Sequence, residues 1–312
     1  MDVAHTPVLL RETVELLAPR RGGVFVDATL GLGGHAEAIL DAGPAVRLVG
    51  IDRDPQALER ARERLARFGE RVRFVRGNFE DLAELLAGQG PVAGILADLG
   101  VSSLQLDTPE RGFSFRFDGP LDMRMGPEGP TAADLVNGLA EEELARIFWE
   151  YGDERQSRRI ARAIVAERRV KPIGTTGELR ATIDRAKRRE PGARDREGRV
   201  DPATRVFQAL RIEVNRELSG LERFLAQAVE RLEADGRLVV ISYHSLEDRV
   251  VKNVLRDGAR GEIDLVTGRP RSESQVIEVL TRKPVRPTEA EVAWNPRSRS
   301  ARLRAGRRLE SR

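Results

Sequence analysis

A glycine-rich turn near the start of the chain has residue types and spacing that suit a nucleotide-like ligand. Gly31, Gly33 and Gly34 follow the strand-like run 24–26 and precede the helix-like run 36–40. Glycines between the first strand and first helix of an α/β sheet let the backbone approach a ligand closely. No Gly-Lys-Ser/Thr follows them, and the regular G-x-G-x-x-G pattern is absent. A phosphate-free nucleoside such as S-adenosylmethionine is therefore favoured over a pyrophosphate; a turn needed only for tight packing is the alternative.

Aspartates end two of the strand-like runs that come next. Asp52 follows the run 47–51, roughly 20 residues beyond the glycines, where an acidic side chain suits the two hydroxyls of a ribose. Asp98 follows the run 92–97 in the same way. Both carboxylates are therefore candidates for contacts with the ligand or with the reacting group.

The absence of cysteine narrows the chemistry. The chain has 312 residues and no cysteine, which excludes disulfides, thiolate zinc sites, iron–sulfur clusters and a cysteine nucleophile. Methylation at carbon 5 of a pyrimidine usually begins with thiolate attack and is disfavoured, whereas methylation of an exocyclic amine stays open. His5, His35 and His244 form no H-E-x-x-H pair, so no histidine-based metal site is expected.

Charge leaves two interpretations open. The net charge is only +3, but the basic residues are mostly arginine and the pI is about 9.6. Such charge often gathers on one face of a nucleic-acid-binding protein, or it reflects genome composition or growth temperature and is spread over solvated helices. No apolar run is long enough to span a bilayer and no secretory signal is visible, so we expect a soluble, cytoplasmic protein without membrane contact.

The elements that must position these residues alternate between strand and helix. Four strand-like runs, 24–26, 47–51, 72–75 and 92–97, are separated by helix-like segments. This alternation predicts a doubly wound, mostly parallel, Rossmann-like α/β sheet. Ligands bind such sheets at the carboxyl ends of the strands. We expect the glycine turn and the two aspartates to meet there.

The alternation stops after the fourth run. Helical segments at 132–151, 154–169 and 176–189 precede a long predicted helix at 202–232. A buried strand follows at 237–242, with last strands at 276–281 and 300–304. We predict a methyltransferase-type domain formed by 1–105 and 206–312, with a mainly helical domain, 106–205, inserted into it.

Long motifs along most of the chain carry a family resemblance. They are HTPVLL at 5–10, the glycine turn ending in His35, DLGVSSLQLD at 98–107, RGFSF at 111–115, PLDMRM at 120–125, PATRVFQALR at 202–211, SYHSLEDR at 242–249 and NPRSRS at 295–300. In this order they resemble the bacterial family that methylates N4 of a cytidine in the decoding region of 16S ribosomal RNA. The family usually has phenylalanine where Tyr243 stands.

The resemblance implies a class I methyltransferase fold, S-adenosylmethionine as cofactor and 16S rRNA as partner, within the small ribosomal subunit. It implies that Gly33, Gly34 and His35 line the methionine end of the cofactor and that Asp52 binds its ribose. By the same resemblance, Phe79 packs on the adenine, with a core aromatic as the alternative. The resemblance also implies that Asp98 and Gln105 make polar contacts near the methionine part of the cofactor.

Methylation of a cytosine amine gives two candidate catalytic residues. The lone pair of this amine is delocalised into the ring, so a group that accepts its hydrogen bonds would localise the lone pair during in-line attack. Asp98 is the best-placed acceptor unless the cofactor occupies it. His244, just past the run 237–242, is the second candidate, with a purely structural hydrogen bond as its alternative.

Contacts with RNA are predicted for the inserted domain, the loop 111–125 and a basic tail, 297–308. Phenylalanines alternate with arginines in the loop and could stack an extruded base, or they pack the insertion internally. The candidate substrate-binding residues are Arg111, Phe113, Phe115 and Arg116.

Two other functions stay open at this level. A nicotinamide-dependent oxidoreductase uses a similar sheet, although the dinucleotide pattern is imperfect here. A non-catalytic RNA-binding assembly factor would keep the fold without the activity. The sequence leaves the oligomeric state undecided.

Overall fold

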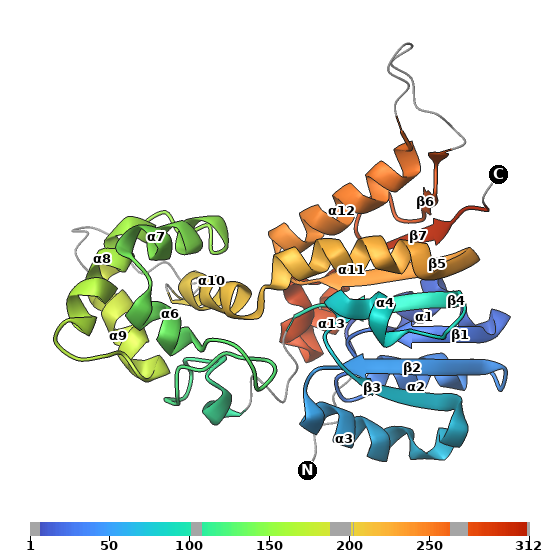
Figure 1. Cartoon of the computed structure of the whole chain (residues 1–312), viewed down its shortest axis with the longest axis horizontal. Helices are drawn as coiled ribbons and strands as arrows, with labels where there is room; N and C mark the ends of the chain where they lie inside the picture. Colours follow the sequence, from blue (N-terminus) through green and yellow to red (C-terminus); the bar gives the residue numbers. More distant parts are fainter. Residues whose placement is uncertain (1–6, 101–107, 188–200, 202, 263–273, 311–312) are drawn as a thin grey trace. The chain divides into compact units, whose positions relative to one another are not determined.

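The computed structural model of the protein describes residues 7–100, 108–187, 201, 203–262 and 274–310 (Figure 1). The chain divides into two compact units. Residues 1–100 and 218–312 form the first unit, and residues 101–217 form the second unit. The assignment of separate roles to an outer and an inserted domain stays a prediction.

Strands of the first unit form one seven-stranded sheet among the described residues, with the order β3-β2-β1-β4-β5-β7-β6. Neighbours among β1 to β5 are parallel, and β7 is antiparallel to both β5 and β6. This confirms the doubly wound, mostly parallel sheet. The strands are β1 (Gly23–Asp27), β2 (Val46–Asp52), β3 (Val72–Arg76), β4 (Val92–Asp98), β5 (Leu232–Ser242), β6 (Ile277–Val279) and β7 (Arg302–Arg308).

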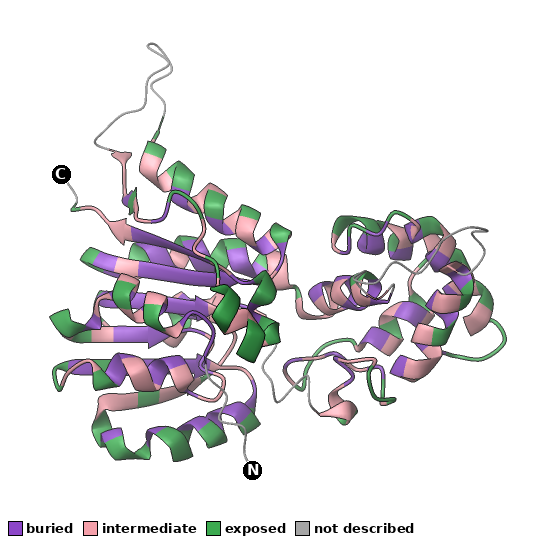
Figure 2. Cartoon of the chain, turned by 180° about the vertical axis from the view of Figure 1, so that it is seen from behind, coloured by how far each residue is buried: buried purple, intermediate pink, exposed green. Residues whose placement is uncertain are grey.

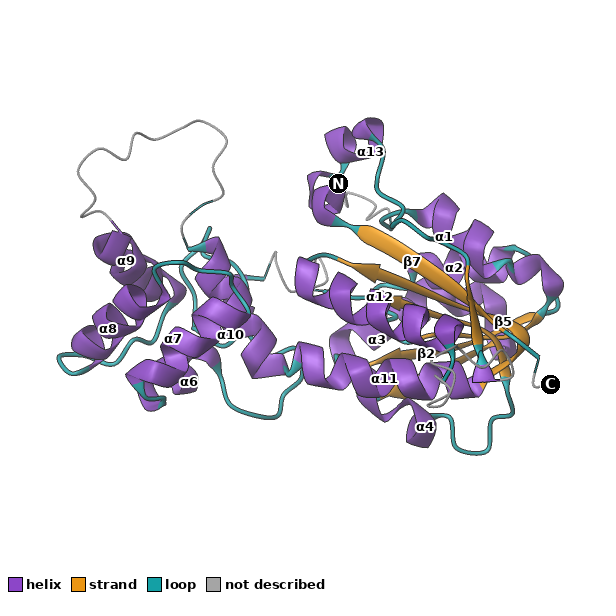
Figure 3. Ribbon diagram, turned by 90° about the horizontal axis from the view of Figure 1, so that it is seen from above, coloured by secondary structure: helices purple, strands orange, loops and turns teal. Residues whose placement is uncertain are grey.

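Helices cover both faces of this sheet (Figure 3). Side chains alternate between the faces of a strand. Phe25 and Ile241 therefore pack toward α1 (Leu10–Leu17), α2 (Gly34–Asp41) and α3 (Pro55–Leu65), and Val26 and Val240 toward the other face. That face carries α4 (Leu82–Leu85), α11 (Glu217–Arg231) and α12 (Ser245–Arg260). Burial on two faces explains why the strands read as continuous apolar runs (Figure 2).

Shorter elements complete the described part of the first unit. Asp54 begins α3 as its N-cap, with its side chain accepting from the Gln56 N–H and Pro55 at the first helical position, as expected for a helix start. The remaining elements of this unit are α13 (Glu289–Trp294) and the short 3₁₀ helices Pro19–Arg21, Ala66–Arg71, Phe79–Asp81 and Pro296–Ser300.

The second unit is mainly helical and has its own core. Phe148, Ile160 and Leu210 are fully buried in it. Its elements are the 3₁₀ helix Pro109–Arg111 and the helices α6 (Ala132–Gly138), α7 (Glu141–Glu150), α8 (Ser157–Arg168), α9 (Thr176–Lys187) and α10 (Thr204–Asn215).

Two predicted helical segments are each divided. The segment 132–151 forms α6 and α7, because Leu139 and Ala140 are extended and the Glu143 carboxylate accepts from the Ala140 N–H at the new helix start. The single helix predicted for 202–232 is wrong. Arg216 is in the left-handed conformation, φ 51°, and separates α10 from α11. An L-residue there costs roughly 1–2 kcal/mol, and no glycine or proline marks the break.

Tertiary contacts hold that break within the second unit. The Asn215 amide donates to the Met123 carbonyl and accepts from the Met125 N–H. Arg211 pairs with Glu217 through two bonds of 2.8 and 2.9 Å. These partners are distant in sequence or lie across the break, so helical periodicity alone does not reveal it.

The predicted last strand at 300–304 corresponds to β7, which extends to Arg308 and pairs with both β5 and β6. Most of the basic segment 297–308 is therefore part of the sheet, and its contact with RNA stays a prediction. Arg304 is buried, and its guanidinium donates to the Asp248 carboxylate at 2.6 and 3.2 Å. Alternating arginines on a strand thus serve the fold. Throughout the described ranges, no helix combines the length and apolar character required to cross a membrane.

Candidate functional site

The glycine turn lies between β1 and α2, as predicted. Gly33 is the N-cap of α2 with φ 76°, a left-handed conformation that glycine adopts without strain. A side chain is excluded at Gly34 for another reason, since a Cβ there would lie 2.5 Å from Cγ of Pro7. At Gly33 a Cβ would lie 3.3 Å from Leu65 Cδ1, so side chains of this chain occupy the space beside both glycines. Tight packing therefore explains the absence of side chains here, and close approach by a ligand stays a prediction.

Asp52 ends β2 and bridges two loops. Its Oδ2 accepts from the Gly31 N–H at 2.8 Å, and its Oδ1 accepts from the Asp54 N–H at 2.9 Å. Burial raises the pKa of Asp52, although these two backbone donors oppose the shift. The carboxylate thus fixes the glycine turn beside the end of β2, where the ribose is predicted to bind.

Asp98 ends β4, and both its side chain and its backbone make hydrogen bonds with other segments of the chain. Tyr243, which follows β5, donates its hydroxyl to Asp98 Oδ1 at 2.9 Å. The Asp98 N–H donates to Thr29 Oγ1 at 2.6 Å. Gly100, with φ 115°, leaves room for the tyrosine ring, since a Cβ there would lie 3.1 Å from Tyr243 Cδ2. Burial raises the pKa of Asp98 to about 7; the Tyr243 hydrogen bond opposes this and Glu247 adds to it.

His35 lies in the first turn of α2 and is buried. Its Nε2 is 3.0 Å from the Val8 carbonyl oxygen. Its Nδ1 is 3.6 Å from Asp98 Oδ2, within ion-pair range but longer than a hydrogen bond. The structure therefore brings together His35 and Asp98, two residues that were predicted for the cofactor separately.

Sequence reasoning missed two participants at this edge. Asp27, the last residue of β1, is buried and accepts from the Thr29 N–H at 3.2 Å. Burial raises the pKa of Asp27 to about 7, and the charges of Asp98 and Asp52 contribute. Tyr243 is the second. Its departure from the phenylalanine usual in the resembling family was the available signal, but its partner lies 145 positions away.

His244 occupies a structural position. It is the N-cap of α12, where its Nδ1 accepts from the Glu247 N–H at 3.4 Å and its Nε2 is 3.1 Å from Glu247 Oε1. The Glu247 carboxylate returns the contact by accepting from the His244 N–H. This reciprocal cap accounts for Nδ1 and the backbone N–H of His244, whereas its buried Nε2 makes no hydrogen bond among the described residues. The catalytic role of His244 stays a prediction.

Phe79 begins the 3₁₀ helix after β3 and is half-buried. Its ring meets Phe224 of α11 edge-to-face, with centroids 5.1 Å apart. It packs on the core and keeps part of its surface exposed, so both the adenine contact and the core aromatic remain open. Gln105, predicted near the methionine part of the cofactor, lies outside the described residues.

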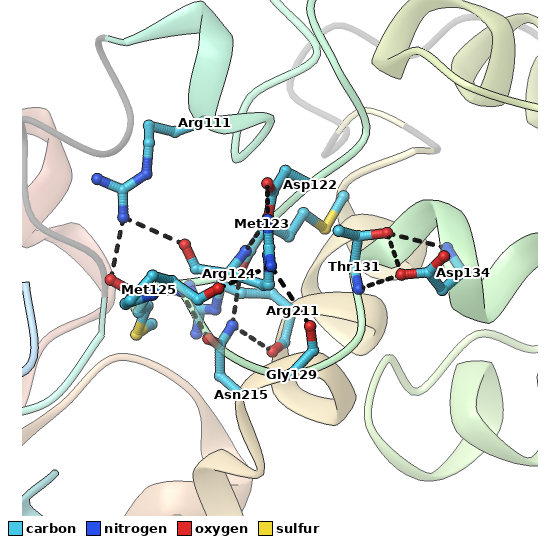
Figure 4. Close-up of polar contacts among 11 residues, drawn as sticks. Arg111, Asp122, Met123, Arg124, Met125, Gly129, Thr131, Asp134, Arg211 and Asn215 are labelled. Atoms are coloured by element: carbon cyan, nitrogen blue, oxygen red, sulfur yellow. Dashed lines mark hydrogen bonds and ion pairs between the residues drawn. The ribbon is translucent and has the colours of Figure 1, made fainter.

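In the loop 111–125 of the second unit, Arg111 turns inward. Its guanidinium donates to the carbonyls of Arg124 and Met125 at 3.2 and 3.0 Å (Figure 4). Arg124 forms a two-armed ion pair with Asp122, each arm 2.8 Å long. Arg111 therefore shapes the loop, and a direct contact with RNA has to compete with these bonds.

The other candidate RNA contacts differ in exposure. Phe113 is buried and Phe115 packs edge-to-face on Phe207 with centroids 4.9 Å apart, which supports internal packing for both. Arg116 is exposed, and so is Phe117, with 61% of its surface accessible. Arg116 and Phe117 are thus better placed to meet a base than the buried Phe113 and the half-buried Phe115.

The order of the sheet, the glycine turn after β1 and the acids at the carboxyl edge define a Rossmann-like methyltransferase that uses S-adenosylmethionine. The description "MraW methylase family" belongs to the family model that matches residues 2–309. The chain belongs to this family.

Curated relatives are similar along the whole chain. A protein of Granulibacter bethesdensis is 51% identical over 307 residues, covering 96% of this chain and 90% of the relative. One of Geotalea uraniireducens is 52% identical over 315 residues and one of Carboxydothermus hydrogenoformans 50% over 317, each covering 99% of both chains. All three are named ribosomal RNA small subunit methyltransferase H.

Replacing Asp52 with alanine should weaken the binding of S-adenosylmethionine by about 1–3 kcal/mol, the usual cost of losing hydrogen bonds to a charged group. The variant should also be less stable, because the Gly31 and Asp54 N–H groups lose their acceptor. Asp54→Ala is the matched control, since it removes a neighbouring carboxylate that caps α3, a cap worth about 1 kcal/mol. Calorimetry measures affinity and urea unfolding measures stability; equal cofactor affinity in both variants would refute the ribose role.

Replacing Asp27 with asparagine should stabilise the protein more at pH 8 than at pH 5. The folded-state pKa, about 7, lies above the ordinary value of 3.8, so through this group stability falls as pH rises between these values. An amide never ionises and still accepts from Thr29. At about 1.4 kcal/mol per pKa unit the gain at pH 8 is at most about 4 kcal/mol. Urea unfolding at both pH values checks this, and an equal change at each would contradict it.

Proposed function

We propose that this protein transfers a methyl group from S-adenosylmethionine to the exocyclic N4 of a cytidine in the decoding region of 16S rRNA. The single observation that carries the proposal is the carboxyl edge of the first unit's sheet. There the glycine turn, the half-buried Asp52 and the Tyr243-bound Asp98 lie at the ends of adjacent strands. Family membership and the names of the relatives support the substrate.

Residues of this edge suit the cofactor. The glycine turn and Asp52 would hold its methionine end and its ribose, and Phe79 would contact the adenine. The cofactor supplies a methyl group activated by a positively charged sulfur. Asp98 would accept a hydrogen bond from the cytidine amine and orient its lone pair toward that methyl group, so orientation and charge supply the rate.

We place the substrate within the small ribosomal subunit and the enzyme in the cytoplasm, where that subunit is made. The second unit supports an RNA-binding role, because α8 and the turn before it carry a row of exposed arginines. These are Arg155, Arg158, Arg162 and Arg169. Arginines spaced by three, four and seven positions share one side of a helix and suit a phosphate backbone.

Methyl labelling should identify the reaction. Small subunits and naked 16S rRNA from cells lacking the modification are incubated with methyl-labelled S-adenosylmethionine, and the product nucleoside is identified by mass spectrometry. We expect N4-methylcytidine from at least one of the two substrates, and Asp98→Asn provides the impaired control. Absence of label in any rRNA would favour the non-catalytic assembly factor. Calorimetry that shows binding of NAD and not of S-adenosylmethionine would favour the oxidoreductase.

A further inference from the structure

Asp98 has a different neighbour on each oxygen. The Tyr243 hydroxyl donates to Oδ1 at 2.9 Å, and Nδ1 of His35 faces Oδ2 at 3.6 Å. The side chains of His35 and Asp98 are only 7% and 23% exposed. Water therefore screens this contact weakly. The protonation state of either side chain then strongly affects the free energy of protonating the other.

The position of the histidine proton follows from the second ring nitrogen. Nε2 of His35 lies 3.0 Å from the carbonyl oxygen of Val8, which can only accept. Nε2 must therefore carry a hydrogen, and a neutral imidazole carries only one. Nδ1 then turns a lone pair toward the Asp98 carboxylate. Two lone pairs repel each other across this gap, whereas one added proton makes the contact attractive.

We propose that His35 and Asp98 share one exchangeable proton, carried either on Nδ1 or on Oδ2 across their 3.6 Å ion-pair contact, and that this pair takes up the proton released by the cytidine amine. The proposal rests on the proposed function. His35 acts through Asp98 and is a positioning residue, whereas Asp98 contacts the amine.

Atoms and electrons balance in this step. The lone pair of N4 forms the new bond to the methyl carbon, while the carbon–sulfur bond breaks with its electron pair going to sulfur. One N–H bond of the amine breaks, its electrons stay on nitrogen, and the proton passes to Oδ2 of Asp98. There it also faces Nδ1 of His35 and relieves the repulsion.

The other titratable groups around Asp98 favour uptake of this proton. Glu247 of α12 faces it and raises its pKa. Asp27, on the neighbouring strand, has a pKa raised by burial, by Asp98 and by Asp52. Burial and Asp98 raise the pKa of Tyr243 well above its usual value, so the tyrosine stays a donor. With the pKa of Asp98 at about 7, both forms of the pair are populated near neutral pH.

Nitrogen-15 NMR of the ligand-free protein tests the shared proton without any activity assay. The chain has only three histidines, and the His35→Gln variant identifies the signals of His35. We expect Nε2 to carry hydrogen at every pH and Nδ1 to gain it as pH falls. In Asp98→Asn, the midpoint of this Nδ1 titration should move down by about one pH unit or more. An unchanged midpoint, or hydrogen found on Nδ1 alone at high pH, would overturn the proposal.

The pH dependence of single-turnover methyl transfer tests whether this pair accepts the proton of the cytidine amine. His35→Gln keeps a donor for Val8 but removes Nδ1, so the midpoint of the rate profile should fall. Tyr243→Phe removes a donor that lowers the pKa of Asp98, so its midpoint should rise. The two variants should therefore shift the midpoint in opposite directions. A merely structural defect would change the rate without moving the midpoint. Shifts in the same direction, or none, would refute the shared proton. A wild-type enzyme that labels no cytidine would instead refute the proposed function, while the NMR result stands independently.

Discussion

Replacing Asp98 with asparagine should slow methyl transfer by about an order of magnitude or more when cofactor and RNA are both saturating. The amide keeps the shape of the side chain and can still accept from Tyr243. It removes the negative charge that holds the cytidine amine and its developing positive charge. RNA affinity should change little, because the lost interaction forms mainly during transfer. Single-turnover rates with labelled cofactor provide the measurement.

Two comparisons separate this catalytic role from cofactor binding and from catalysis by His244. If Asp98 serves only the cofactor, a higher concentration of S-adenosylmethionine restores the rate of Asp98→Asn, and the catalytic assignment fails. His244→Ala should slow turnover only if its imidazole contacts the reacting base. Because His244 instead caps α12 through Glu247, we expect lower stability with a smaller change in rate. Near-normal rates in both variants would leave positioning alone as the mechanism.

Replacing Arg304 with methionine should destabilise the protein by about 3 kcal/mol, near the lower end of the range for breaking a buried ion pair. The side chains of Arg304 and Asp248 are 8% and 15% exposed, and the closest contact is 2.6 Å. Without its partner, the Asp248 charge stays buried. Arg302, at 3.8 Å, compensates only partly. The denaturant midpoint in urea, compared at equal slope, measures the loss.

Arg299→Met is the matched control for this prediction. Arg299 is exposed and lies just before β7, and a surface substitution is usually worth less than about 0.5 kcal/mol. Adding Asp248→Asn to Arg304→Met should recover part of the lost stability, since the unpaired charge is then removed. A stability for Arg304→Met equal to that of Arg299→Met would show that the ion pair contributes nothing to the fold.

Local patterns predicted most of the first unit's sheet. Strands buried on both faces need continuous apolar residues, and left-handed backbone favours glycine. Short stretches of sequence therefore predicted β1, β2 and the turn at Gly33. The positions of Asp52 and Asp98 at strand ends followed from strand order alone. Parallel strands bring their carboxyl ends to one edge, and the structure confirms that placement. The cofactor, catalytic and RNA-binding roles of individual residues stay predictions.

The sequence by itself determined the class of fold, the edge of the sheet that carries the acids and, through its motifs, the family. Only the tertiary structure decided which groups meet there. Tyr243 and Asp98 lie 145 positions apart, and the break at Arg216 depends on Asn215 holding a loop about 90 residues away. Periodicity and turn chemistry are properties of neighbouring residues. Pairing between distant segments depends instead on how helices and strands pack, and packing is settled only when the whole chain folds.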